Sequence, residues 1–289
     1  MRDALSPLPA HLLLDLDRYL RELEKTRTHP VRPPLGKKIR VGLDLGTSSI
    51  VLVVLTEDGI PLGLASRPAS VVKDGLVVDF SGARTISQKL KEWLEKKLEI
   101  RLPQAALAVP PGTGERDKAT HGYVSQAAGL EPSGIFDEPV AANLLIGLEN
   151  GALADLGGGT TGVALFRQGQ MVLSFDQPTG GYHMSLVIAG HLKIPLERAE
   201  AFKLEANNRQ VVAPLIAPVL KKMGTILAQG LKNQAVSSLF LVGGSAMAPG
   251  AVQIIAQETG LEVKTAPRAD LITPVGIALA CEPFYPTLL

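Results

Sequence analysis

Two short loops in this chain carry the residue types that bind polyphosphate. Residues 44–49 read Asp-Leu-Gly-Thr-Ser-Ser, and residues 155–161 read Asp-Leu-Gly-Gly-Gly-Thr-Thr. Glycine lets backbone N–H groups approach a phosphate oxygen, and serine and threonine hydroxyls add further donors. An aspartate at a strand end suits magnesium, which prefers oxygen ligands and keeps several waters. The loops therefore predict a site for ATP and Mg²⁺, with Asp44 and Asp155 as the metal-binding residues.

One glycine-rich hairpin alone is typical of an ordinary turn, but two copies that both begin Asp-Leu-Gly favour a phosphate clamp. The residues expected to contact phosphate are Gly46, Thr47, Ser48, Gly157, Gly158, Gly159, Thr160 and Thr161. Residues 157–162 also match the dinucleotide fingerprint G-x-G-x-x-G, which must open a helix, whereas residues 163–166 are typical of a strand. The sequence has no G-x-x-x-x-G-K-[ST] motif, so it does not encode a P-loop.

The elements around the loops repeat. Strands are expected at residues 39–43, 50–55 and 60–65, and again at 151–154, 163–166 and 170–175. This repetition indicates an internal duplication. Further strands are expected at 105–109 and 238–242, and helices at 81–98, 117–128, 139–148, 196–206, 211–231 and 273–280. Because strands and helices alternate, the predicted fold class is α/β.

Composition supports two related domains. The chain has 289 residues, of which 46% are hydrophobic, 20% charged and only 4% aromatic, so the core must be aliphatic. The net charge of +1 gives no reason to expect nucleic acid as a partner. Cys281 is the single cysteine, which excludes an internal disulfide and fits a reducing, cytoplasmic setting. No stretch is long and apolar enough to predict a membrane span.

The domain boundaries expected from the sequence are an amphipathic helix within residues 1–27, a Pro/Gly linker at 28–37, one lobe at 38–145 and a second at 146–289. The helix, expected from about residue 9 to 26, places apolar side chains on one stripe. Two interpretations stay open: a helix packed on the body of the protein, or a detachable docking helix. A membrane anchor is disfavoured because the polar face mixes acids with arginines.

The order of motifs resembles the superfamily of actin, heat-shock chaperone and sugar-kinase ATPases. Besides the two loops, Glu-Pro-Val-Ala-Ala at 138–142 and Pro-Val-Gly-Ile-Ala at 274–278 resemble its connecting helices, and Leu-Val-Gly-Gly-Ser at 241–245 its adenosine motif. The resemblance spans residues 38–281. It implies an actin-like ATPase fold, with two duplicated ribonuclease-H-like lobes and a nucleotide cleft between them.

The resemblance also implies roles for single residues. Glu138 would orient the attacking water or act as a base, and Asp155 would be the second catalytic residue. The alternative for Glu138 is purely structural, because the helix dipole favours an acidic side chain at a helix N-terminus. Glu200 and Lys203 would contact adenosine, or form a simple surface ion pair. The remaining residues expected near the nucleotide are Gly180, Gly181, Gly243, Gly244 and Ser245.

Residues 73–80 resemble a segment of MreB-like and FtsA-like proteins, while the compact plan resembles the chaperone-like proteins of ethanolamine-utilisation operons. That resemblance implies an ATP-driven clamp that protects or reactivates ethanolamine ammonia-lyase, or another enzyme of a bacterial microcompartment. Its N-terminal helix would dock on a shell protein through Leu12, Leu16, Tyr19 and Leu23. The lysine that DnaK-type chaperones use in hydrolysis has no counterpart here, so we expect at most a slow Mg-dependent ATPase.

Three alternatives stay open at this point. The first is an actin-like filament or scaffold protein of the MreB or FtsA type. The second is a small-metabolite kinase, which is disfavoured because no large insertion is present for an acceptor site. The third is a nucleotide-binding scaffold without catalysis.

Overall fold

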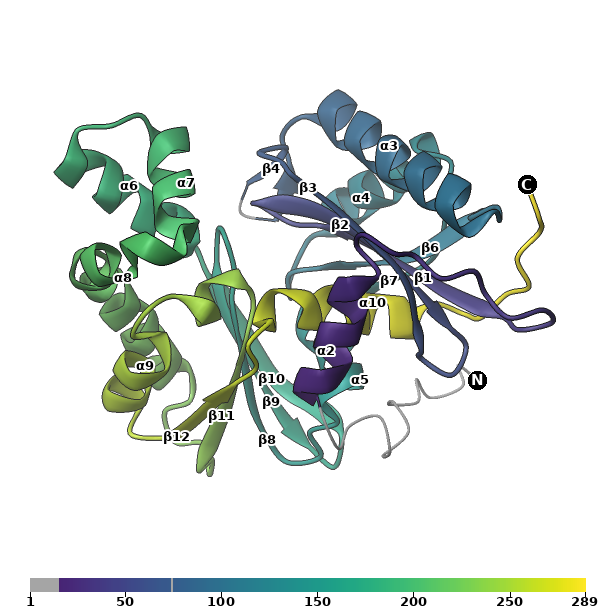
Figure 1. Ribbon diagram of the computed structural model, residues 1–289. Helices are drawn as coiled ribbons and strands as arrows, with labels where there is room; N and C mark the ends of the chain where they lie inside the picture. Colours follow the sequence, from purple (N-terminus) through teal and green to yellow (C-terminus); the bar gives the residue numbers. More distant parts are fainter. Residues whose placement is uncertain (1–15, 74) are drawn as a thin grey trace. The chain divides into compact units, whose positions relative to one another are not determined.

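The computed structural model describes residues 16–73 and 75–289, and the chain divides into two compact units (Figure 1). The first unit runs to Gly147 and resumes at Leu271–Leu289, and the second unit is Leu148–Asp270. Each contains a five-stranded sheet, in the order β3-β2-β1-β6-β7 or β10-β9-β8-β11-β12. The two orders follow the same plan, which confirms the duplication expected from the repeated loops.

The first unit holds, in chain order, α2 (Leu16–Lys25), β1 (Ile39–Leu45), β2 (Ser49–Thr56), β3 (Pro61–Pro68), β4 (Val72–Lys73), β5 (Leu76–Val77), α3 (Phe80–Leu98), β6 (Gln104–Val109), α4 (Glu115–Ala127), β7 (Glu131–Asp137), α5 (Glu138–Ile146) and α10 (Ile272–Ala280). The second unit holds β8 (Gly151–Leu156), β9 (Thr161–Arg167), β10 (Gln170–Gln177), α6 (Gly181–Leu192), α7 (Leu196–Leu204), α8 (Arg209–Gly230), β11 (Ser238–Val242), α9 (Ala251–Thr259) and β12 (Glu262–Thr265). Short 3₁₀ turns lie at Ala206–Asn208, Gly244–Met247 and Ala269–Leu271.

The strands and helices expected from the sequence are present with end shifts of a few residues. The sequence analysis missed β4, β5, β7, α6, α9 and β12. A strand, β9, begins within the residues that match the dinucleotide fingerprint, where that motif requires a helix, so the rejection of the motif is confirmed. Of the missed elements, α6 matters most, because it begins beside the second loop.

Helices cover both faces of the first sheet. Gly42 on β1 lets α10 pack closely against the sheet, because a Cβ at this position would lie 2.4 Å from the Ala278 nitrogen. Gly63 on β3 faces the other way, where a Cβ would lie 2.7 Å from Leu94 of α3. Figure 1 shows α3 and α10 on opposite sides of this sheet. The core between the sheet and α3 is aliphatic, as the composition predicts.

The last helix belongs to the first unit, whereas the sequence-based division assigned residues 271–289 to the second lobe. α10 crosses α5 so closely that a Cβ on Gly276 would lie 2.0 Å from the Ala141 carbonyl oxygen. The guanidinium of Arg40 on β1 donates to the carbonyls of Leu279 and Cys281 at 2.7 and 2.8 Å. These contacts hold the end of the chain against the first sheet.

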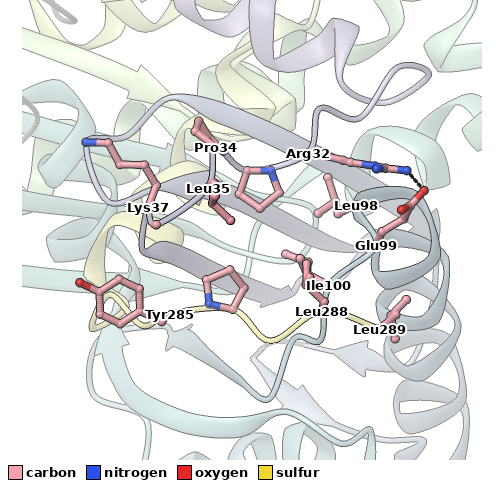
Figure 2. Close-up of a pocket in the computed structure, with 13 residues that line it drawn as sticks. Arg32, Pro34, Leu35, Lys37, Leu98, Glu99, Ile100, Tyr285, Leu288 and Leu289 are labelled. Atoms are coloured by element: carbon pink, nitrogen blue, oxygen red, sulfur yellow. Dashed lines mark ion pairs between the residues drawn. The ribbon is translucent and has the colours of Figure 1, made fainter.

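A cavity of about 600 Å³ lies between the linker and the C-terminal tail of the first unit (Figure 2). It is lined by linker residues 32–37, by residues 98–100 at the C-terminal end of α3, and by Tyr285, Pro286, Leu288 and Leu289. An ion pair between Arg32 and Glu99 crosses its rim. None of the residues expected to bind nucleotide lines this cavity.

One described helical stretch, Ala206–Gly230, has the length and composition of a membrane span. Its α8 portion buries Val212, Ile216 and Leu220 completely and packs against α6, α9 and β9 of the second unit. Core helices of soluble domains share this composition, and the burial of one full stripe is typical of them. We therefore interpret α8 as a core helix.

The described part of the N-terminal helix is packed on the body of the protein. Tyr19, Leu20 and Leu23 of α2 are 6%, 1% and 0% exposed. The Tyr19 hydroxyl donates to the Gly59 carbonyl at 2.8 Å, and burial raises the pKa of this phenol well above its usual range.

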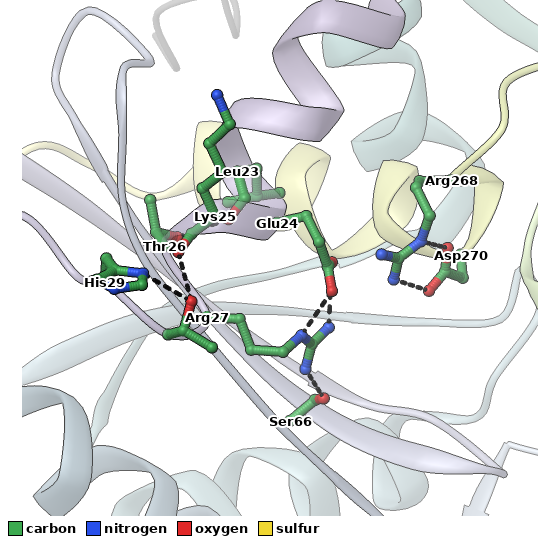
Figure 3. A network of polar contacts seen from close by, with 10 residues as sticks. Leu23, Glu24, Lys25, Thr26, Arg27, His29, Ser66, Arg268 and Asp270 are labelled. Carbon is green, nitrogen blue, oxygen red and sulfur yellow. Dashed lines mark hydrogen bonds and ion pairs between the residues drawn. The ribbon is translucent and has the colours of Figure 1, made fainter.

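The segment that follows α2 also lies along edge strand β3. Arg27 binds Glu24 and contacts Ser66 of β3 (Figure 3). The Val31 N–H donates to the Leu62 carbonyl at 2.8 Å. Helix and linker therefore cover the outer edge of this sheet, which limits its pairing with other chains.

Of the two interpretations left open by the sequence, the described part of the helix takes the packed one, and the docking role stays a prediction. A helix that docks on a shell protein must present Tyr19 and Leu23, and both side chains are buried against the first unit. Leu12 and the expected start of the helix lie outside the described residues.

We expect Leu23→Ala to lower the free energy of unfolding by about 2–4 kcal/mol, because it leaves a cavity under α2. Leu35→Ala is the matched control, since Leu35 is 99% exposed in the linker, and should change stability by less than about 0.5 kcal/mol. Urea denaturation of the full chain measures both. Equal, small effects would show that α2 is detachable.

Candidate functional site

The second of the two expected phosphate loops, residues 155–161, joins β8 to β9 in an antiparallel hairpin and is called the second phosphate loop below. Leu156 pairs with Thr161, and Asp155 pairs with Gly162 on one side and with Val242 of β11 on the other. The Gly157 N–H donates to the Thr160 carbonyl at 3.0 Å, which closes the loop. Asp155 thus stands at the end of a central strand, half-buried beside the loop.

The first turn of α6 holds this loop in place. The N–H groups of Gly181 and Tyr182 donate to the carbonyls of Gly157 and Gly158, at 3.0 and 2.8 Å. A Cβ on Gly180 would lie 2.5 Å from the Gly158 oxygen, so only glycine allows this approach. Gly180 and Gly181 thus contact the loop directly through their backbone, and their expected place near the nucleotide stays a prediction.

These bonds use two carbonyl acceptors of the loop, those of Gly157 and Gly158, and none of the loop's N–H donors. Among the residues that the structure describes, the N–H groups of Gly158, Gly159 and Thr160 donate to no protein acceptor. Successive unpaired amides in a glycine-rich turn form a concave anion-binding surface. This arrangement is chemically suited to phosphate oxygens.

Thr161 has a different role from the one expected. Its side chain is fully buried, and its hydroxyl donates to the Thr179 carbonyl at 2.6 Å. This bond ties β9 to the residue just before Gly180. In this structure the hydroxyl supports the loop from inside and is not open to a phosphate.

The motif at residues 243–245 also packs on the loop. The Ser245 hydroxyl, on the 3₁₀ turn after β11, donates to the Gly157 carbonyl at 2.8 Å. Gly243 has a φ of +87°, and a Cβ there would lie 2.3 Å from Asp155 Oδ1. The chain therefore needs glycine at this position to bring β11 past the aspartate. Gly244 is exposed and has open space around its Cα.

Glu200 and Lys203 form more than a surface ion pair. Lys203 Nζ binds Glu200 at 2.7 Å and also donates to the Gly181 carbonyl and the Ser185 hydroxyl, both at 2.9 Å. Ser185 also contacts the Glu200 carboxylate. The Lys203 side chain is only 11% exposed, so the cluster fixes α7 against the start of α6. Sequence analysis missed Ser185, because only its place one helical turn after Gly181 marks it.

The first phosphate loop repeats the hairpin in the other unit. Asp44 pairs with Val51 and Leu45 with Ile50, the same spacing as in the second loop. A Cβ on Gly46 would lie 2.9 Å from the Ser49 carbonyl oxygen, so the turn also depends on glycine. Thr47 and Ser48 lie between these residues in the turn.

The catalytic role of Glu138 and the magnesium-binding role of Asp44 and Asp155 stay predictions. Glu138 is the first residue of α5, directly after β7, and its side chain is half-buried. Asp44 lies in the first unit and Asp155 in the second. No group of three or more His, Cys, Asp or Glu side chains suited to one metal occurs among the described residues. Magnesium that keeps most of its waters needs few protein ligands, so the donor set is compatible with it.

Duplicated sheets with matching phosphate hairpins define an actin-like ATPase fold. Family models match part of the chain: Type IV pilus assembly protein PilM at residues 148–273, and MreB/Mbl protein at residues 64–203. MreB5 of Spiroplasma citri, in a crystal structure bound to AMPPNP, is similar with a TM-score of 0.64 and 17% identity. That match covers 84% of this chain and 95% of MreB5. At this identity it supports the fold alone.

Two relatives with higher sequence identity identify the family of this chain. The ethanolamine utilization protein EutJ of Salmonella typhimurium is 40% identical over 239 residues, which cover 82% of this chain and 84% of that protein. The crystal structure of EutJ from Carboxydothermus hydrogenoformans has 42% identity and a TM-score of 0.86, and covers 92% of this chain and 98% of that one. The chain belongs to the EutJ family. The resemblance to proteins of ethanolamine-utilisation operons is thereby confirmed.

Proposed function

We propose that this protein binds Mg-ATP and that the second phosphate loop grips the phosphates. The observation that carries the proposal is the set of unpaired N–H groups at Gly158, Gly159 and Thr160. Backbone donors fixed by α6 and Ser245 need no reordering when an anion binds, which favours affinity. The hairpin at residues 46–48 of the first unit supplies a second set of donors.

Around the phosphates, each remaining residue takes a role that its chemistry supports. Asp44 and Asp155 hold Mg²⁺ through its waters, and the metal offsets phosphate charge when bound. Glu138 orients the attacking water. Lys203 and Glu200 lie beside the start of α6 and contact the nucleoside end. Turnover is slow without a partner.

We further propose a chaperone-like role in ethanolamine utilisation, with ethanolamine ammonia-lyase as the client. Membership of the EutJ family supports the link to that system. ATP stabilises the conformation of this protein that it binds better. Only the difference in ATP affinity between two conformations can shift the equilibrium between them and so change a bound client. A coupling free energy of about 1–3 kcal/mol is usual for such linkage.

Titration calorimetry tests the nucleotide site. We expect saturable Mg-ATP binding by the full chain, lost in Asp155→Ala and at least about tenfold weaker in Gly180→Ala, a cost of about 1.4 kcal/mol. The alanine Cβ at position 180 pushes directly on the Gly158 carbonyl, which displaces the loop.

Gly190→Ala is the matched control, because Gly190 lies on the same helix and a Cβ there meets nothing within 4 Å. It should bind Mg-ATP as the unchanged chain does. Absence of binding by the folded, unchanged chain would refute the nucleotide proposal. Equal affinities for Gly180→Ala and Gly190→Ala would refute the role of the α6 contact.

An activity assay tests the client. Ethanolamine ammonia-lyase inactivated by turnover should regain activity when the full chain and Mg-ATP are both present, and Asp155→Ala should abolish the recovery. The non-hydrolysable analogue AMPPNP separates binding from hydrolysis. Recovery that is the same without nucleotide, or no recovery at all, would contradict the proposed role.

A further inference from the structure

The C-terminal tail exposes apolar side chains in the wall of the cavity of about 600 Å³ in the first unit. Tyr285, Leu288 and Leu289 line this cavity and are 66%, 77% and 56% exposed. Its lining also includes Leu98 and Ile100, which belong to the core and are each 1% exposed. Concave apolar surface of this size is typical of a binding site, and burial of its walls favours an apolar occupant.

Charged groups stand on opposite sides of the cavity and leave its middle apolar (Figure 2). On one side Arg32 pairs with Glu99. On the other side Lys37 Nζ binds Asp58 at 3.0 Å. Because both cations already have acidic partners, the cavity favours an uncharged apolar chain over an anionic ligand.

The start of α2 lies at the same end of the β2–β3 hairpin as the cavity. The Tyr19 hydroxyl, in the first turn of α2, donates to the Gly59 carbonyl at 2.8 Å. The linker returns to this turn, where the Glu57 N–H donates to the carbonyl of Lys38, the residue after the cavity-lining Lys37. The chain that precedes α2 is therefore tethered close to the cavity.

We infer that the cavity receives Leu5 and Leu8 of this chain's own N-terminal segment, which pack against the tail. Residues 1–15 lie outside the described residues, and their sequence is rich in leucine. Pro7 and Pro9 disfavour the α conformation for the residue before each of them. A polyproline II segment has three residues per turn, so leucines three apart share one face.

The length of the tether suits this occupant. Leu8 precedes Leu16 by eight residues, which span about 12 Å as a helix and up to about 28 Å when extended. The leucines at 12–14 fall within the helix expected from residue 9, which leaves Leu5 and Leu8 as the leucines before its start. A short tether gives an effective concentration of roughly millimolar, so a modest apolar contact is enough to hold the segment. This binding does not depend on nucleotide.

Cysteine trapping tests the contact in the full chain, with Cys281→Ala as background. Leu8→Cys combined with Leu288→Cys should form an intramolecular disulfide under mild oxidation, because the two side chains meet in the cavity. The matched control combines Leu8→Cys with Tyr123→Cys, since Tyr123 is 59% exposed on α4 and does not line the cavity. We expect the first pair to close at least about tenfold faster than the second.

Equal rates for the two pairs would overturn the proposal. Disulfides that join two chains in preference to closing within one would also overturn it, because they would assign the cavity to the segment of a second copy. Mass analysis without reductant distinguishes these products.

Hydrogen exchange of the full chain provides a measurement without cross-links. Leu5→Asp combined with Leu8→Asp should speed exchange at residues 287–289 and 99–101 at least about threefold, because the released segment no longer covers the tail. The amides at stake include the Leu289 N–H, which donates to the Glu99 carbonyl at 3.2 Å.

Ala4→Asp combined with Ser6→Asp is the matched control, because it adds the same charge at positions on other faces of a three-residue turn. It should leave exchange at residues 287–289 as in the unchanged chain. Identical exchange in the two double variants would show that Leu5 and Leu8 do not occupy the cavity.

Discussion

The second phosphate loop keeps its shape because Gly180 and Gly181 let the first turn of α6 touch it through backbone alone. Two N–H groups of α6 donate to loop carbonyls, and the Ser245 hydroxyl donates to one of the same carbonyls, that of Gly157. With its acceptors occupied in this way, the loop is left with donors for an anion. Any side chain at Gly180 would separate the helix from the loop. The proposed anion-binding surface therefore depends on the absence of one Cβ.

The same plan occurs in both units, but their surroundings differ. In the second unit the helix that follows the hairpin supports the loop. In the first unit α2 covers the edge strand, and α10 returns from the end of the chain to fill the other face of the sheet. The close crossing of Gly276 and Ala141 is what attaches this last helix to α5. Duplication thus supplies the hairpins, while separate helices adapt each copy.

Local patterns in the sequence predicted the parts that depend on neighbouring residues. The Asp-Leu-Gly hairpins and core helix α8 are encoded by glycine position and hydrophobic period. The sequence did not reveal α6, because its apolar residues lie on both faces and show no amphipathic period. Nor could it show that the Thr161 hydroxyl is used by Thr179, or that Ser185 joins Lys203. Those contacts depend on tertiary packing, which residue spacing does not specify.

Hydrogen exchange of the full chain, with and without Mg-ATP, tests the central claim most directly, because it observes the amides in question. The account predicts slower exchange at residues 158–160, and at 46–48 of the first unit, when Mg-ATP is bound. Exchange in α3, which carries no expected site residue, should stay unchanged. Unaltered exchange at residues 158–160 under saturating Mg-ATP would contradict the account.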